Sequence, residues 1–289
     1  MVAQLCLAIG IGVASLAFAA GVAVFCLQTR RGCSERLAPF RKVFIVHRGL
    51  FDNAAGVPEN SLAAFQRAVD NGYGIEMDVQ LSEDGELVVF HDENLHRMCG
   101  VDRLVRECAF ADLAEMRLGA SSERIPLFSD VLKCVAGRVP LIVEIKPEGD
   151  CIGAAVKAAA LLDAYTGEYC VESFEPRVVR WFRQNRPDVI RGQLSTDYFK
   201  DKEPGAFWRR FLLSNLLLNW RGKPDFIAYN HKYAGKLAYR ICRAIYHPVN
   251  VAWTIRSQDE LRQASQVFDV FIFDSFIPKQ NECDKVCSF

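Results

Sequence analysis

The chain has 289 residues, and its 35 Lys and Arg balance its 35 Asp and Glu, which gives a formal net charge of zero. A balanced charge supplies no overall field for nucleic acid, so no nucleic-acid partner is expected. The 11 cysteines form no CxxC pair. This pattern argues against a structural zinc site and favours free thiols in a reducing compartment.

The N-terminal segment, residues 5–27, is almost entirely apolar, and about twenty such residues cross a bilayer core as a helix. We therefore expect a transmembrane anchor over residues 1–28. A cleaved signal peptide, which would give a secreted protein, is the alternative because Ala17-Phe18-Ala19 has the small-x-small pattern. The first four residues, however, lack the basic side chain of a signal.

Residues 29–42 predict a basic linker, and its Arg and Lys side chains favour a single-pass protein with the folded domain, residues 43–289, on the cytoplasmic side. A linker of this length extends to about 50 Å and would let the domain turn its mouth toward the lipid.

Short runs rich in β-branched and aromatic residues alternate with helix-like stretches in residues 43–289, which is typical of βαβ units. Their nearly continuous apolar character fits strands buried on both faces, and the number of runs suits an α/β fold, the (β/α)₈ TIM barrel. An open doubly wound sheet is disfavoured because no Gly-rich fingerprint follows the first run. The runs are Val43–His47, Ile75–Val79, Leu141–Lys146, Tyr169–Phe174, Val189–Leu194, Asp225–Asn230, Val249–Ile255 and Val267–Asp274.

Two segments interrupt this alternation. Glu83-Asp84-Gly85-Glu86 is a turn signal, and Leu87–Phe90 after it predicts a strand, so we expect a small hairpin insertion after the second barrel strand. Phe199–Arg221 is apolar and aromatic with basic residues near its ends. It fits either a helix lying in a membrane interface or an outer-ring helix followed by a loop.

Carboxylates lie near the ends of two neighbouring runs, where active sites of this barrel are found. Glu76 and Asp78 are two residues apart on a strand, so both side chains project to the same side, and Glu144 lies on the next run. Three carboxylates facing one centre repel one another unless a cation neutralises them. Oxygen ligands suit Mg²⁺ or Ca²⁺ rather than zinc, so we expect one divalent cation.

Two histidines fall at the same end of the barrel. His47 closes the first run and His91 follows the hairpin. One imidazole can take a proton from an attacking oxygen while the other gives one to a leaving oxygen, and Arg48 and Lys146 add positive charge for a phosphoryl group. This pattern predicts phosphodiester cleavage. The remaining histidines lie outside the cluster: His96, His231 and His247.

An ordered series of motifs over about residues 43–278 resembles the glycerophosphodiester phosphodiesterase family. The series includes His47-Arg48-Gly49, Pro58-Glu59-Asn60-Ser61, Glu76-Met77-Asp78-Val79, His91-Asp92, Leu95-His96-Arg97, Val143-Glu144-Ile145-Lys146, Val171-Glu172-Ser173-Phe174, Ala252-Trp253-Thr254 and Ile272-Phe273-Asp274. One departure is the set of large residues in the final run, expected to narrow the pocket: Phe268, Phe271 and Phe273.

The resemblance implies a role for each matched residue. It makes His47 and His91 the acid/base pair and assigns the divalent cation to three acids, Glu76, Asp78 and Glu144. It places Arg48 and Lys146 on the phosphate and Glu59 beside the site, with the substrate groove lined by Phe174 and Trp253. It also implies that the substrate's glycerol hydroxyl attacks phosphorus, giving a cyclic phosphate that water then opens.

The expected function is therefore metal-dependent hydrolysis of a glycerophosphodiester to glycerol 3-phosphate, or a related phosphomonoester, and an alcohol. The anchor raises an alternative, lysophospholipase D-type hydrolysis of a lysophospholipid or another membrane lipid phosphodiester. A second alternative is a catalytically silent, membrane-tethered binding barrel. A zinc amidohydrolase is disfavoured because the first run does not end in His-x-His.

Overall fold

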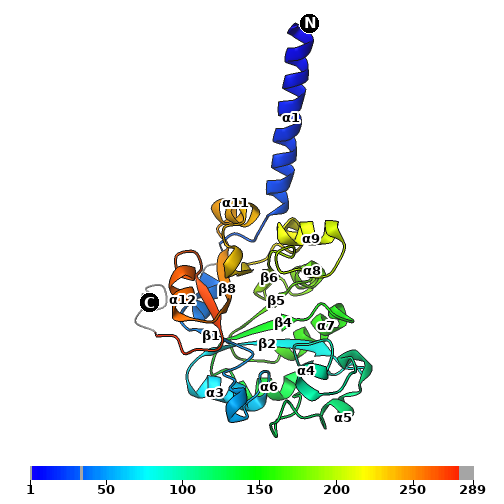
Figure 1. The fold of residues 1–289 in the computed structure, drawn as a ribbon, viewed down its shortest axis with the longest axis vertical. Helices are drawn as coiled ribbons and strands as arrows, with labels where there is room; N and C mark the ends of the chain where they lie inside the picture. Colours follow the sequence, from blue (N-terminus) through cyan, green and yellow to red (C-terminus); the bar gives the residue numbers. More distant parts are fainter. Residues whose placement is uncertain (1, 33–34, 280–289) are drawn as a thin grey trace.

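A closed barrel forms the centre of the protein in the computed structural model, which describes residues 2–32 and 35–279. Each barrel strand pairs in parallel with its neighbours, and β1 pairs with both β2 and β9, which closes the ring. The expected (β/α)₈ barrel is confirmed (Figure 1). Its strands are β1 (Ile45–His47), β2 (Gly74–Leu81), β4 (Leu141–Ile145), β5 (Tyr169–Ser173), β6 (Arg191–Ser195), β7 (Phe226–Asn230), β8 (Val249–Ile255) and β9 (Val270–Phe273).

The hairpin insertion is also confirmed. β3 (Leu87–Val89) runs antiparallel to the end of β2, with Val79 opposite Val89 and Leu81 opposite Leu87. The chain leaves β3 directly into His91, so the hairpin carries this histidine to the mouth of the barrel.

Helices surround the barrel, and N-cap residues help to determine where several of them begin. Ser61, for example, accepts a hydrogen bond from the backbone N–H of Ala64, which caps the next helix. The helices of the barrel are α3 (Leu62–Asp70), α4 (His96–Cys99), α5 (Phe110–Leu113), α6 (Phe128–Val135), α7 (Cys151–Leu162), α8 (Pro176–Asn185), α9 (Phe207–Ser214), α10 (Asn219–Gly222), α11 (Leu237–Tyr246) and α12 (Gln258–Ala264). Short 3₁₀ turns lie at η2 (Asn53–Ala55), η3 (Val105–Glu107) and η4 (His231–Tyr233).

The core has two layers because successive strand residues point to opposite sides. On β9, Ile272 belongs to the apolar cluster inside the barrel, whereas Phe271 and Phe273 pack in the layer between strands and helices. Phe268 lies in that outer layer as well. The expected narrowing of the pocket by these phenylalanines is therefore wrong, since none of them lines the cavity at the mouth of the barrel.

Residues 35–41 are folded rather than extended. They form η1 (Glu35–Leu37) and α2 (Ala38–Arg41), and both Leu37 and Phe40 are buried in the cluster inside the barrel. Their neighbours there include Ile45 and Val249 at the starts of strands, so the segment closes the N-terminal end of the barrel. These residues, the second half of the predicted linker, thus pack against the domain, because their apolar side chains fill the base of the barrel.

The stretch Phe199–Arg221 forms two short helices, α9 and α10, instead of one. Leu216 between them has a positive φ of 56°, a left-handed conformation that ends the first helix. The stretch thus has the form of an outer-ring helix with loops, and it exposes aromatic side chains at Phe207, Trp208, Phe211 and Trp220.

α1 (Val2–Cys26) projects away from the barrel (Figure 1). Its residues Ile9–Cys26 have a mean hydropathy of 2.2 and are not buried against the domain. By length and composition α1 suffices to cross a membrane, and a signal sequence passes the same test.

Candidate active site

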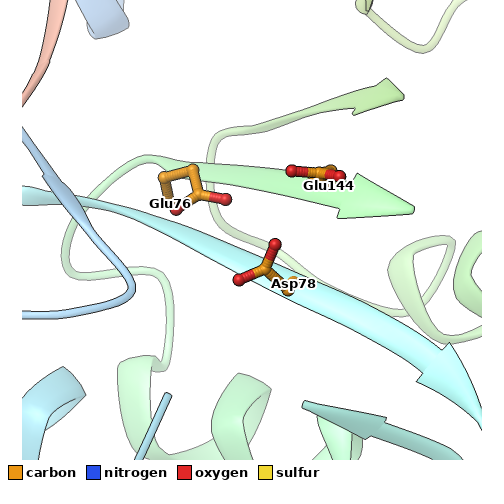
Figure 2. A group of neighbouring side chains, drawn as sticks. All are labelled: Glu76, Asp78 and Glu144. Carbon is orange, nitrogen blue, oxygen red and sulfur yellow. The ribbon is translucent and has the colours of Figure 1, made fainter. Parts of the chain in front are cut away.

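Three carboxylates converge at the C-terminal end of the barrel, as Figure 2 shows. Glu76 and Asp78 project from β2 and Glu144 from β4, where Asp78 and Glu144 are register partners. One oxygen atom of each carboxylate lies within 4.8 Å of the others, and all three side chains are buried. Adjacent parallel strands therefore supply the converging acids that the spacing predicts.

The three acids differ in their electrostatic surroundings. Burial, together with the charges of Asp78 and Glu144, raises the pKa of Glu76 well above its usual value. Burial also raises the pKa of Glu144, against the opposing charge of Lys146. For Asp78, burial is outweighed by Lys146, His91 and Arg48, which hold its pKa below the usual range.

This donor set fits a hard divalent cation. Its members are carboxylate oxygens, and their mutual repulsion is the kind that a cation relieves. Nearby Glu172 is also buried, and its Oε2 has no hydrogen-bond partner among the described residues. The acidic triad is thus compatible with a divalent metal.

His47 ends β1 and is held by a carboxylate. Its Nδ1 lies 2.8 Å from Oδ2 of Asp274, which follows β9, and Arg256 Nε donates to the other oxygen of Asp274 at 3.0 Å. Burial lowers the pKa of His47, while its hydrogen bond to Asp274 acts in the opposite direction.

His91 has a similar partner on its own loop. Its Nδ1 lies 2.6 Å from Oδ1 of Asp92, and Arg97 Nε donates to Oδ2 of Asp92 at 2.6 Å. Burial opposes ionisation of Asp92, but hydrogen bonds from His91 and Arg97 keep its pKa low.

Arg48 links the first strand to the acids. Its Nη1 donates to Glu59 Oε1 at 2.8 Å, and its Nε lies 3.3 Å from Asp78 Oδ2. Its φ is 58°, and this left-handed backbone turns its own N–H toward Glu76 Oε2 at 3.1 Å. Glu59 also accepts hydrogen bonds from Arg97, so it supports the site through two arginines.

Lys146 lies among the acids. Its Nζ is 3.0 Å from Glu144 Oε1 and 3.4 Å from Asp78 Oδ1. Burial would lower the pKa of Lys146, but the two carboxylates raise it, so it remains a cation.

A cavity of about 170 Å³ opens between these groups. Phe174 and Trp253 form one wall, with ring centroids 5.5 Å apart in an edge-to-face arrangement. The structure thus brings the predicted site residues together, most of them lining the cavity and the rest in contact with those that do. The cavity is lined by His47, Arg48, Glu76, His91, Glu144, Glu172, Phe174, Leu194, Asn230, Lys232, Trp253, Thr254, Arg256 and Ile272.

Several site residues were given no role by sequence reasoning. Asp274 carried a usable signal, because it closes the last apolar run just as His47 closes the first. Asp92 directly follows His91 and was noted only as part of a motif. Arg97, in α4, was likewise noted only as part of a motif, and Lys232, in η4, lies where no strand pattern marks it. His96, His231 and His247 do not line the cavity, as expected.

By class, the protein is therefore a (β/α)₈ barrel that carries three convergent carboxylates and two carboxylate-held histidines at its mouth. The chain belongs to the glycerophosphoryl diester phosphodiesterase family, whose model matches residues 47–275. This match spans all the predicted site residues.

Individual relatives agree with this assignment. The chain is 30% identical over 201 residues to human glycerophosphodiester phosphodiesterase 1, covering 61% of this chain and 58% of the human one. It is 36% identical over 114 residues to a glycerophosphodiester phosphodiesterase of Caldanaerobacter subterraneus, covering 37% and 46%. The chain spans less than two thirds of the length of the curated relatives it matches.

Solved structures share the fold. A phosphodiesterase from Oleispira antarctica in complex with the product sn-glycerol-3-phosphate has a TM-score of 0.66 at 22% identity, covering 85% of this chain and 95% of that one. A glycerophosphodiester phosphodiesterase from Thermotoga maritima has a TM-score of 0.62 at 24% identity, covering 81% and 95%.

Proposed function

We propose that this protein hydrolyses a glycerophosphodiester to glycerol 3-phosphate, or a related phosphomonoester, and an alcohol. The observation that carries the proposal is the convergence of three buried carboxylates beside a cavity that two imidazoles line, with each imidazole held by its own carboxylate. Family membership supports the same reaction class.

His47 is the proposed general base. A protonated Nδ1 donating to Asp274 leaves Nε2 as the nitrogen available to the cavity, and the lowered pKa of His47 favours its neutral form. Its Nε2 can then take the proton of the substrate's glycerol hydroxyl, which attacks phosphorus to give a cyclic phosphate that water afterwards opens. His91, oriented by Asp92, donates a proton to the leaving alcohol oxygen.

Positive charge near the phosphoryl group comes from Arg48 and Lys146, whose side chains lie beside the acids. A divalent cation held by Glu76, Asp78 and Glu144 would supply charge stabilisation for the phosphoryl oxygens. Lys146 keeps two of these acids in place, and Glu59 restrains Arg48. The wall of Phe174 and Trp253 suits the glycerol part of the substrate.

The location of the protein is part of the proposal. The apolar length of α1 supports a single-pass membrane anchor. Arg30 and Arg31 directly after it favour a cytoplasmic domain by the positive-inside rule.

The proposal is tested by incubating the full chain with glycerophosphocholine and with glycerophosphoethanolamine, in the presence of Mg²⁺, of Ca²⁺ or of a chelator, and measuring glycerol 3-phosphate. We expect cation-dependent release of product. The His91→Ala variant should lower kcat by about 10²–10⁴, because general acid–base catalysis contributes that much. His96→Ala, an exposed histidine outside the cavity, serves as the matched control.

The same experiment separates the alternatives. A parallel assay with a lysophospholipid measures hydrolysis of a lipid phosphodiester. If only that substrate is turned over, the lysophospholipid replaces the glycerophosphodiester as the assigned substrate. A silent binding barrel would show no turnover of any substrate while keeping its affinity for glycerol 3-phosphate. Product release unaffected by chelator would contradict the assignment of a cation to the three acids.

A further inference from the structure

The last turn of α1 is joined to the folded domain by specific contacts. Leu27, just after the helix, is 2% exposed and belongs to the main apolar core. The hydroxyl of Tyr246 in α11 donates to the carbonyl of Val24 at 2.8 Å, and the ring of Phe25 lies 6.1 Å from that of Trp220 in α10. The direction of α1 is therefore fixed relative to the barrel by α10 and α11.

Exposed apolar side chains gather around this junction. Outside α1, nine large apolar residues of the described chain are exposed, and six of them come from α9, α10 and α11. Phe207 is 73% exposed, Trp208 is 64% and Leu237 is 68%. Figure 1 shows α9 and α11 at the foot of α1, at similar heights along its axis. We call these residues the shoulder patch: Phe207, Trp208, Phe211, Trp220, Leu237 and Ile245.

The chemistry of the shoulder patch matches the boundary between lipid and water. Aromatic side chains, Trp above all, concentrate at that boundary, and Arg side chains there reach the headgroups. Arg221 lies 5.3 Å from the ring centroid of Trp220, and Arg31 lies 5.9 Å from that of Tyr246 beside the end of α1. Patch and cations therefore surround the point where an apolar helix leaves the domain.

We propose that the shoulder patch lies in the headgroup layer of the bilayer that α1 enters, so that the protein has a second, peripheral contact with the membrane. Lipid is favoured over another protein as the occupant because α1 continues the same apolar surface, and its exposed residues Ile9–Cys26 themselves have the length and hydropathy of a bilayer span.

The patch also adjoins the mouth of the barrel. Arg209 in α9 donates to Glu175 Oε2 at 3.1 Å. Glu175 directly follows Phe174, which lines the cavity. The ring centroids of Phe174 and Tyr198 lie 6.4 Å apart, and those of Phe199 and Phe207 of the patch lie 5.3 Å apart. In Figure 1, β2 and β4, which carry the three acids, run across the direction of α1.

The test uses the full chain in phosphatidylcholine vesicles whose acyl chains are brominated near the glycerol backbone. The emission of Trp208 is obtained by subtracting the spectrum of Trp208→Phe from that of the parent. We expect brominated lipid to reduce this emission at least about twofold, since an interfacial Trp contacts the upper acyl chain, while aqueous iodide has little effect. The same subtraction with Trp253→Phe should give an emission that brominated lipid leaves unchanged.

Quenching of Trp208 by iodide and not by brominated lipid would overturn the proposal. Quenching of Trp208 by iodide could instead fall as the protein concentration rises, with no quenching by brominated lipid. That result would show that a second copy of the chain covers the patch, and it would also overturn the proposal. A Phe207→Ser/Phe211→Ser variant should reduce the quenching by lipid while leaving turnover of soluble glycerophosphocholine unchanged. The membrane contact is thus tested separately from the proposed activity.

Discussion

His47 ends the first strand of the barrel and Asp274 directly follows the last, so their contact exists only because the ring closes. Asp274 has a second partner, Arg256, so its carboxylate is held on both oxygens. Its pKa is kept low because the hydrogen bonds from His47 and Ser275 outweigh the effect of burial. A fixed anion at this position orients the imidazole and favours its protonated form.

Replacing this anion should change both the rate and its pH dependence. For Asp274→Asn we expect kcat to fall roughly 10–100-fold, the usual effect of losing a carboxylate that orients a functional histidine. Asp274 raises the pKa of His47, so its loss should lower that pKa and move the acidic limb of the kcat/KM profile to lower pH. The profile is measured by steady-state assays on glycerophosphocholine.

Asp259→Asn provides the control for this prediction, because Asp259 is exposed and pairs with Arg262 on the same helix. An unchanged pH profile in Asp274→Asn, accompanied only by a lower melting temperature, would reduce Asp274 to a structural role.

Elements were predicted best where the sequence pattern is local. The run Val249–Ile255 matches β8 in full, because its apolar residues alone determine a buried strand. The run from Val267 was too long, since the N–H of Val267 bonds to Ala264 and closes α12 instead of entering β9. Similarly, Glu76 and Asp78 were predictable from strand alternation. The role of Arg97 was not, because it reaches the site from α4, outside the barrel strands.

The closing segment α2 could not be predicted, and it offers a test of stability. Leu37 and Phe40 are isolated apolar residues in a basic stretch, and the space that they fill is formed by distant strands. Phe40→Ala should lower the free energy of unfolding by about 3–5 kcal/mol, because it leaves a cavity inside the barrel. Chemical denaturation measures the change.

Glu35→Ala, at an exposed position of the same segment, should stay within about 0.5 kcal/mol of the parent. A small effect of Phe40→Ala would indicate that η1 and α2 lie on the barrel without supporting it. KM for the substrate should not change in either variant, since the cavity lies at the opposite end.

The folding stability of the whole molecule depends on pH through the buried acids Glu76 and Glu144. Glu76 and Glu144 have pKa values raised above the usual 4.5, so the cation-free folded state keeps protons that the unfolded chain releases above that pH. These groups therefore stabilise the fold less as pH rises from 4.5 through their folded pKa values. A cation bound by these acids would take the place of the protons and remove this loss.

Adding Mg²⁺ or Ca²⁺ should therefore raise the melting temperature, and more strongly at about pH 7.5 than at about pH 5.5. At about 100 times Kd the gain is about 2.7 kcal/mol, which corresponds to roughly 5–10 °C for a domain of this size. Calorimetry with and without chelator measures it. Glu144→Gln should abolish most of the gain, and an equal gain in that variant would place the cation elsewhere.

The burial of Leu27 and Phe40 has a practical consequence for producing this protein. The family match begins at residue 47, after both side chains, although both are integral to the core. A recombinant fragment trimmed to that boundary would lose the residues that seal the base of the barrel and would expose apolar surface to aggregation. Solubility is better sought by substituting polar residues on the outward side of α1 than by deleting the segment between α1 and the first strand.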